Sequence, residues 1–230
     1  MFNRSGELRM AAAESLWIIG NTEEWLSERK TAMFEIEASA YAGNADGQKN
    51  LGDCYRPGTG VKADTKKAME WYLLAAEQNI AGAQNAIGEA YYQYGWSGEE
   101  NPAEAVKWFS LAADQGNVEA LDNLAHCYNL GYGVEQNQDE YIRLLTLSAE
   151  GGYSSAQFWL AGEYEYGNWV EQSDEEAMKW YTLAAESGSA VPQVTLGDCY
   201  FDGNCTEKDY TQALKWYSLA AAQNDSQAQY

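Results

Sequence analysis

A pattern that repeats about every 36 residues constrains the fold of this chain more than any other feature. Self-similarity at a fixed period is typical of repeat architectures, in which each unit buries its apolar face only against its neighbours. Two adjacent large residues recur five times, at Trp71-Tyr72, Trp108-Phe109, Leu144-Leu145, Trp180-Tyr181 and Trp216-Tyr217. A second pair keeps the same step, at Leu51-Gly52, Ile87-Gly88, Leu124-Ala125, Leu160-Ala161 and Leu196-Gly197.

Each repeat predicts two helices joined by a glycine-containing loop. Apolar residues recur at helical spacing in the first helix, as in Ala83, Ile87 and Tyr91. Preferred N-cap residues open the second helix, at Asp64, Asn101, Asn137, Ser173 and Asp209. In four repeats Glu or Gln follows three residues later, which predicts a capping box. One column predicts the end of the second helix in the left-handed conformation: Asn79, Gly116, Gly152, Gly188 and Asn224.

Small residues inside the first helix indicate how the helices stack. Glycine there costs about 1 kcal/mol relative to alanine, so a column that includes Gly52, Gly88 and Gly197 needs a structural reason. We expect the backbone of a neighbouring helix to approach closely at these positions.

The pattern therefore predicts an all-α solenoid of stacked helix pairs. Five repeats are expected over residues 45–224, preceded by a degenerate helical capping repeat over residues 1–44. Residues 225–230 are expected to begin a further, truncated repeat.

The segment Leu51 to Glu77 resembles the Sel-one-like repeat, a subclass of the tetratricopeptide-type helical repeats. It follows the pattern Leu-Gly-x-x-Tyr, Gly-x-Gly-Val and Lys-Ala-x-x-Trp-Tyr-x-x-Ala-Ala-Glu. The third repeat departs most, with Tyr141 for a small residue and Leu144-Leu145 for the aromatic pair. The resemblance implies a right-handed superhelix that serves as an adaptor or scaffold for protein complexes. Bacterial members of the family are linked to signalling, envelope assembly and host interaction.

Composition restricts the partners of such a protein. With 14 Lys and Arg against 35 Asp and Glu, the formal charge is −21. This charge repels nucleic acid and anionic lipid and would attract basic proteins or peptides. The alternative is that the spread surface charge serves solubility alone. No apolar run is long enough to span a membrane, and no secretory signal is evident. Provided that the N-terminus is native, we expect a cytoplasmic protein.

The four cysteines are expected to be free thiols. Cys54, Cys127 and Cys199 occupy equivalent positions in different repeats, which lie too far apart for a disulfide. Cys199 and Cys205 are the one pair that could meet.

Exposed columns that vary between repeats are candidates for partner binding. Since the resemblance places the first helix on the concave surface, three of its columns would form a groove that becomes apolar toward the C-terminus. These columns run Lys49, Asn85, Asp122, Phe158 and Val194; Asp53, Glu89, His126, Gly162 and Asp198; and Arg56, Tyr92, Asn129, Glu165 and Phe201. The alternative is an ordinary solvated face. Three loop aromatics are further candidates, because aromatic residues are enriched at binding hot spots: Trp96, Tyr132 and Trp169. Each of these could instead fold back onto its own repeat.

No residue pattern predicts catalysis, metal binding or a cofactor. His126 is the only histidine, and Asp122 precedes it by one helical turn. Cys127 follows directly, but successive helical residues point about 100° apart and cannot form a nucleophile pair. The Gly-x-Gly segments lack the strand and the lysine of a phosphate-binding loop.

Three functions are compatible with these observations. The first is a scaffold that binds a partner protein or peptide through the groove and loops. The second is an acidic inhibitor or immunity protein that neutralises a basic toxin or enzyme. The third is an envelope enzyme or cell-wall ligand-binding protein, which the lack of paired cysteines in each repeat disfavours.

Overall fold

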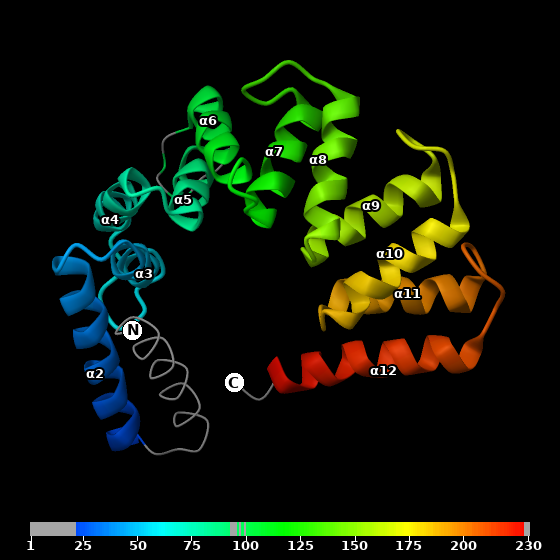
Figure 1. The fold of residues 1–230 in the computed structure, drawn as a ribbon. Coiled ribbons are helices and arrows are strands. Elements are labelled where there is room, and N and C mark those ends of the chain that lie inside the picture. Colours follow the sequence, from blue (N-terminus) through cyan, green and yellow to red (C-terminus); the bar gives the residue numbers. More distant parts are fainter. Residues whose placement is uncertain (1–21, 93–95, 97, 99, 228–230) are drawn as a thin grey trace. The chain divides into compact units, whose positions relative to one another are not determined.

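The protein is all-α in the residues that its structure describes. The computed structural model describes residues 22–92, 96, 98 and 100–227, and the segments of regular structure among them are helices α2–α12 (Figure 1). The chain divides into two compact units, residues 1–115 (unit 1) and residues 116–230 (unit 2). Within each unit every described helix packs against the next helix along the chain.

Unit 1 holds α2 and two helix pairs. The long helix α2 (Thr22–Tyr41) precedes α3 (Ala45–Tyr55) and α4 (Thr65–Glu77), which form the first repeat. The second repeat is formed by α5 (Ala81–Tyr91) and α6 (Pro102–Ala113). In the predicted capping repeat, α2 is the described helix, and the earlier helical segment lies outside the described residues.

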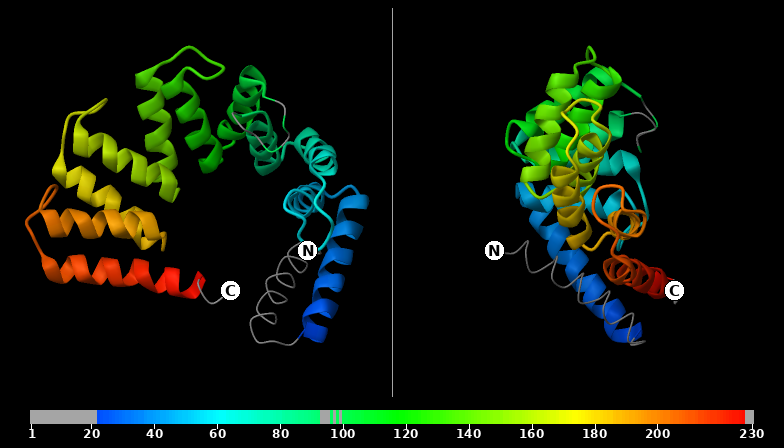
Figure 2. Two further views of the ribbon diagram at one scale, coloured as in Figure 1. Left: turned by 180° about the vertical axis from the view of Figure 1, so that it is seen from behind. Right: turned by 90° about the vertical axis from the view of Figure 1, so that its right-hand side faces the viewer.

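Unit 2 holds the other three helix pairs, which Figure 2 shows from two further sides. The third repeat consists of α7 (Val118–Leu130) and α8 (Gln138–Glu150), and the fourth of α9 (Ser154–Tyr166) and α10 (Asp174–Glu186). The fifth consists of α11 (Ala190–Asp202) and α12 (Tyr210–Gln227). We call the first helix of each repeat helix A and the second helix B.

The predicted N-cap residues open all five B helices. In the first four repeats the side-chain oxygen of Asp64, Asn101, Asn137 or Ser173 accepts a hydrogen bond from the backbone N–H three residues later. Asp209 accepts from the N–H groups of Thr211 and Gln212. These bonds satisfy backbone donors that have no partner within the helix.

The reciprocal half of the predicted capping box is wrong. The N–H of each N-cap residue donates instead to the carbonyl oxygen of a helix A tyrosine, over 2.9–3.0 Å. The tyrosines are Tyr55, Tyr91, Tyr128, Tyr164 and Tyr200. The expected acceptors form ion pairs within their own helices: Glu104 with Lys107, Glu140 with Arg143 and Glu176 with Lys179. Each A–B loop is therefore closed by one backbone hydrogen bond.

The predicted helix stops are confirmed in four repeats. Asn79, Gly116, Gly152 and Gly188 have φ angles of 64°, 78°, 90° and 95°, in the left-handed region that glycine and asparagine tolerate best. The stop predicted at Asn224 is wrong, because α12 continues to Gln227. Residues 225–227 thus belong to α12, and the rest of the predicted further repeat, residues 228–230, lies outside the described residues.

The glycines inside helix A contact aromatic rings, not the helix backbone that we expected. A Cβ atom on Gly52, Gly88 or Gly197 would lie 2.8, 2.5 or 2.6 Å from a ring carbon of Tyr72, Phe109 or Tyr217, respectively. Such distances are far inside van der Waals contact. Each ring is the second aromatic of helix B in the same repeat, so the two recurring pairs of the sequence meet in the core.

Paired glutamines join the two helices of three repeats near the end of helix B. Gln78 Nε2 donates to Gln48 Oε1 over 2.7 Å, and the same bond links Gln115 to Gln84 and Gln223 to Gln193. The acceptors are buried, with 6%, 3% and 5% of Gln48, Gln84 and Gln193 exposed. A buried amide needs such a partner, because an unmade hydrogen bond there is costly. The periodic pattern did not mark these glutamines as structural residues.

None of the described helices combines the length and the apolar character that crossing a membrane requires.

The ring contact predicts opposite effects for two glycine-to-alanine substitutions. Gly88→Ala should lower the free energy of unfolding by about 1–2 kcal/mol, because overpacking against Phe109 outweighs the better helix propensity. Gly162→Ala is the matched control, since the nearest atom to its new Cβ is Tyr181 Oη at 3.7 Å. The control should gain up to about 1 kcal/mol. Urea unfolding followed by tryptophan fluorescence measures both free energies of unfolding. A Gly88→Ala variant at least as stable as wild type would contradict the packing argument.

Candidate functional site

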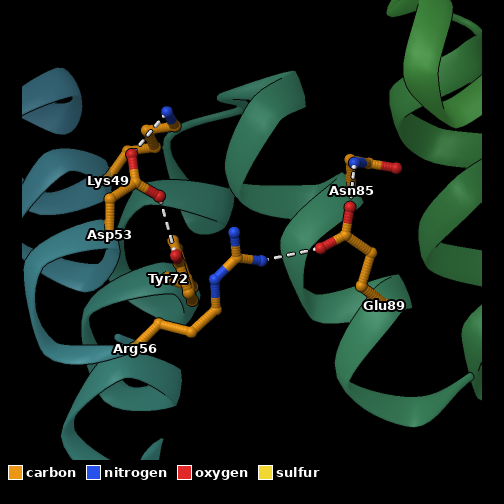
Figure 3. Close-up of polar contacts among 6 residues, drawn as sticks. All are labelled: Lys49, Asp53, Arg56, Tyr72, Asn85 and Glu89. Atoms are coloured by element: carbon orange, nitrogen blue, oxygen red, sulfur yellow. Dashed lines mark hydrogen bonds and ion pairs between the residues drawn. The ribbon is translucent and has the colours of Figure 1, made fainter. Parts of the chain in front are cut away.

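The helix A residues of unit 1 form a network of internal polar contacts. Asp53 accepts from the hydroxyl of Tyr72, with 2.7 Å between Oη and Oδ1, and pairs with Lys49, with 2.6 Å between Nζ and Oδ2 (Figure 3). Burial, and then the Asp53 carboxylate, raise the pKa of Tyr72 far above its ordinary value, so the hydroxyl stays a donor. Both oxygens of Asp53 are thus engaged within the first repeat.

An ion pair links the first repeat to the second. Arg56 Nη1 lies 2.7 Å from Glu89 Oε2, and Asn85 donates to the other oxygen of Glu89 over 3.0 Å (Figure 3). In this repeat Phe109 replaces the tyrosine of helix B, so no hydroxyl is available to the carboxylate. Glu89 binds the neighbouring arginine instead. The two carboxylates of the predicted groove in unit 1, Asp53 and Glu89, are therefore both paired with basic residues of the protein itself.

Unit 2 repeats the bond between a helix B tyrosine and a helix A carboxylate. Tyr181 Oη donates to Glu165 Oε2 over 2.7 Å, and Tyr217 Oη donates to Asp198 Oδ1 over 2.6 Å. These bonds fix two carboxylates that the sequence predicts as partner-binding residues. Glu165 also forms side-chain hydrogen bonds with Tyr166 and Cys205. A carboxylate has about four acceptor positions, so both Glu165 and Asp198 can accept further hydrogen bonds.

Large apolar side chains are exposed on helix A of the fourth and fifth repeats. Trp159 is 48% exposed, Val194 42% and Phe201 50%. Phe158, which is half-buried, lies against Trp159 and Tyr181 with ring centroids 5.9 and 5.7 Å apart. Phe201 contacts the ring of Tyr210 at 5.5 Å. We define the unit 2 helix-A face by Trp159, Glu165, Val194, Asp198 and Phe201.

The negative charge is concentrated in unit 2. Residues 116–230 contain 18 Asp and Glu against 4 Lys and Arg, a formal charge of −14 out of −21. None of the four basic residues lies on α7, α9 or α11; they are Arg143, Lys179, Lys208 and Lys215. Arg143 and Lys179 form ion pairs on helix B. The A helices of unit 2 therefore offer carboxylates and apolar side chains without a competing cation of their own.

The net charge of the whole chain does not reveal this asymmetry. The sequence carries it all the same, because the separate charges of residues 1–115 and residues 116–230 are −7 and −14.

Asp122 is buried, which overturns its predicted place on an exposed column. It is 5% exposed, and its Oδ1 atom lies 3.7 Å from His126 Nε2 and has no hydrogen-bond partner among the described residues. Burial raises the pKa of Asp122 to about 7, although a hydrogen bond with Ser155 acts in the opposite direction. Burial lowers the pKa of His126. The two side chains thus form a desolvated pair.

The surroundings of His126 are aromatic. Trp159 stands edge-on to its ring at 5.6 Å, and Tyr141 lies at 6.2 Å with its hydroxyl donating to Glu163 over 2.9 Å. The adjacent Cys127 is fully buried, and burial raises the pKa of its thiol to about 12. This thiol is therefore protonated at neutral pH and poorly suited to act as a nucleophile.

Three other residues predicted to lie on an exposed surface are buried or packed against neighbouring side chains. Asn85 is 3% exposed, so its predicted exposure is also wrong. Trp96 is half-buried and packs on Tyr72 of the preceding repeat at 5.8 Å, which makes it part of the unit 1 packing and not an exposed loop residue. Tyr92 contacts Phe109 at 5.9 Å.

The other two loop aromatics differ from each other in exposure. Tyr132 is half-buried, as is Asn129 on the preceding helix. Trp169 is 51% exposed and remains a candidate for partner binding.

Among residues 22–92, 96, 98 and 100–227, no group of three or more His, Cys, Asp and Glu side chains is arranged to hold a metal ion.

The pairs of helices, with an equivalent N-cap in all five repeats and an equivalent helix stop in four, define an α-helical repeat protein. More particularly, the chain belongs to the Sel1 repeat family. The family model for the Sel1 repeat matches residues 45–80, 81–117, 118–153, 154–189 and 193–225.

Similar proteins include a fungal regulator and two bacterial Sel1 repeat structures. Chitin synthase regulatory factor 3 of Schizosaccharomyces pombe is 34% identical over 96 residues, which make up 40% of this chain and 10% of that protein. A protective antigen of uropathogenic Escherichia coli has a TM-score of 0.67 at 33% identity, covering 86% of this chain and 42% of its own. A Sel1 repeat protein from Oxalobacter formigenes has a TM-score of 0.72 at 29% identity, covering 94% and 82%. The chain spans only a tenth of the curated relative and less than half of the antigen.

The fold also occurs in an immunity protein from Pseudomonas aeruginosa. Its TM-score is 0.63 at 20% identity, covering 84% of this chain and 74% of its own.

The burial of Asp122 predicts a pH-dependent contribution to stability. The folded protein holds the Asp122 proton up to about pH 7, whereas the unfolded chain releases it near the ordinary aspartate pKa of 3.8. The folded state therefore binds more protons between these values, and this contribution to the free energy of unfolding falls as the pH rises through that window. Asp122→Asn lacks the effect, so its stability relative to wild type should be about 1–2 kcal/mol more favourable at pH 8 than at pH 5.5.

Urea unfolding at both pH values measures this difference. Asp139→Asn, at an exposed aspartate of the same unit, serves as the control and should change little between the two pH values. The comparison is repeated in a His126→Gln background, because His126 is beside Asp122 and is itself a titratable group. An Asp122→Asn effect that is equal at both pH values would show that the carboxyl is not desolvated.

Proposed function

We propose that the protein is an interaction scaffold that holds a basic segment of a partner protein on the unit 2 helix-A face. The observation that carries the proposal is the combination on this face of exposed Trp159, Val194 and Phe201 with Glu165 and Asp198. The sequence placed Val194, Glu165, Asp198 and Phe201 on the variable columns of the groove, and its pattern left Trp159 as either a groove residue or a residue between layers.

The apolar side chains would supply the anchors. Aromatic residues dominate binding hot spots, and a few of them carry most of the energy of an interface. Trp159 and Phe201 each leave about half of their surface in water, so a partner can gain by covering them. The ring contacts of Trp159 with His126 and of Phe201 with Tyr210 already restrict their rotamers, which lowers the entropic cost of binding.

The carboxylates would select a basic partner. Glu165 and Asp198 are held in place by tyrosine hydroxyls and keep acceptor capacity for a lysine or arginine of the partner. The formal charge of −14 on residues 116–230 would also accelerate the encounter, and this contribution falls as salt is added.

The same charge favours a second candidate, in which the bound partner is a basic toxin or enzyme and binding inhibits it. An immunity protein of the same fold illustrates such a role. The identity of the partner separates the two candidates: inhibition of an enzyme by stoichiometric binding would favour the second.

We propose no catalytic role, because the one histidine is a half-buried neighbour of buried Asp122 and the adjacent thiol is protonated. As part of the proposal the protein acts in the cytoplasm, where buried free thiols such as Cys54 persist.

Affinity capture with the tagged chain, at low and high salt, tests the proposal and supplies the partner for titration. The Trp159→Ala/Phe201→Ala variant should weaken the dissociation constant at least tenfold, because both anchors are lost. The Glu165→Gln/Asp198→Asn variant should reduce both the affinity and its salt dependence. Leu183→Ala, which removes a 40% exposed side chain from helix B of unit 2, is the matched control and should bind like wild type.

Trp169→Ala distinguishes a loop site from the helix-A face. If this variant alone loses the partner while the double variants bind normally, the loops are the site and the proposal is wrong. Melting temperatures of all variants exclude unfolding as the cause.

A further inference from the structure

Cys199 and Cys205 lie side by side in the fifth repeat. Cys199 is in the last turn of α11 and Cys205 is in the loop that leads to α12, with 3.8 Å between their Sγ atoms. Both side chains are buried, at 4% and 5% exposure. Between them the chain turns at Gly203, whose φ of 73° brings the loop back over the end of the helix.

The fifth repeat is the only one with cysteine at both of these positions. The residue in the Cys199 column is Cys54, Ala90, Cys127 or Glu163 in the other repeats, and the residue that corresponds to Cys205 is Gly60, Gly133 or Trp169 in repeats one, three and four. Cys54 and Cys127 thus share the helix position but face a glycine position in the loop. They provide internal controls with equally buried thiols, at 6% and 0% exposure.

We propose that Cys199 and Cys205 form a reversible disulfide when the protein meets a low-molecular-weight disulfide such as oxidised glutathione. The inference stands independently of the partner-binding proposal. It goes against our expectation from the sequence, which favoured free thiols at all four positions.

The geometry allows the bond with a small movement. The sulfur atoms must approach from 3.8 Å to about 2.05 Å, the length of a disulfide bond. Cys205 belongs to a loop and not to a helix, so loop adjustment and side-chain rotation can supply this movement without disturbing α11.

The reaction is balanced by reduction of the small disulfide. The thiolate of Cys205 attacks one sulfur of oxidised glutathione, forms a mixed disulfide and releases one glutathione thiolate, which takes up a proton. The thiolate of Cys199 then attacks the Cys205 sulfur, forms the internal bond and releases the second glutathione. The protein loses two protons and two electrons, and one oxidised glutathione becomes two reduced molecules.

The environment makes Cys205 the first nucleophile and makes the reaction slow at neutral pH. Burial, and then Glu165, raise the pKa of Cys205 to about 11, and burial raises the pKa of Cys199 still further. Because exchange proceeds through the thiolate, the rate should rise about tenfold per pH unit between pH 7 and pH 9.

The disulfide would close a ring of residues 199–205, which contains Phe201. Oxidation would therefore restrain the backbone beside an exposed residue of the unit 2 helix-A face.

The test uses the full chain, reduced and then incubated with mixtures of oxidised and reduced glutathione at pH 8. After quenching with N-ethylmaleimide in denaturant, the wild type should lose two of its four labelled thiols. Trypsin releases residues 180–208 as one peptide, since Lys179 and Lys208 flank it, and this peptide should be lighter by two hydrogens. Cys54 and Cys127 should remain labelled.

Cys205→Gly is the matched variant, because glycine occupies the equivalent position in the first and third repeats. This variant should keep its three thiols or acquire only a glutathione adduct at Cys199. Four labelled thiols in the oxidised wild type, or glutathione adducts without an internal bond, would overturn the proposal. Disulfide formation at Cys54 or Cys127 to the same extent would overturn it as well, and circular dichroism confirms that the variant is folded.

Discussion

The contact between a helix B aromatic ring and a helix A glycine is the interaction on which the packing of three of the five repeats depends. In the first, second and fifth repeats the ring of Tyr72, Phe109 or Tyr217 occupies the space that a Cβ would fill. The ring brings the two helices of a pair together and sets their spacing. Where the ring is a tyrosine, its hydroxyl continues across to a carboxylate on helix A and fixes that side chain too.

Through this arrangement the hydroxyl oxygen of a core tyrosine determines the contacts of a carboxylate on the surface. Tyrosine at the core position holds Asp53 or Asp198 within its own repeat, whereas Phe109 leaves Glu89 to form the ion pair with Arg56. A change from tyrosine to phenylalanine in the core thus alters which contacts a surface carboxylate makes. Variation in the helix A columns is therefore partly a consequence of which residue occupies the core.

Much of the fold could be predicted from the sequence because its determinants are local and repeated. The N-caps at Asn101 and Ser173 and the stops at Gly116 and Gly188 depend on a few neighbouring residues, so each repeat confirms the others. The candidate site was harder to predict, because exposure depends on neighbouring repeats. Asp122 shares a column with partly exposed Lys49, yet it is buried beside His126, whose ring in turn contacts Trp159. The hydrogen bond from the Asn101 N–H to the Tyr91 carbonyl oxygen was also hard to predict, because the sequence offers the Glu104 side chain as a nearer acceptor.

The backbone hydrogen bond that closes every A–B loop is the same whatever side chains the loop carries. Tyr128 and Asn137 are joined in the same way as Tyr200 and Asp209, although one loop reads Gly-Tyr-Gly and the other Gly-Asn-Cys. The side chains of a loop can therefore differ, as at Cys205, while the tyrosine and the N-cap residue at its two ends remain hydrogen-bonded. A loop from one repeat could therefore be grafted between the anchor residues of another, which would change the exposed side chains of one repeat at a time.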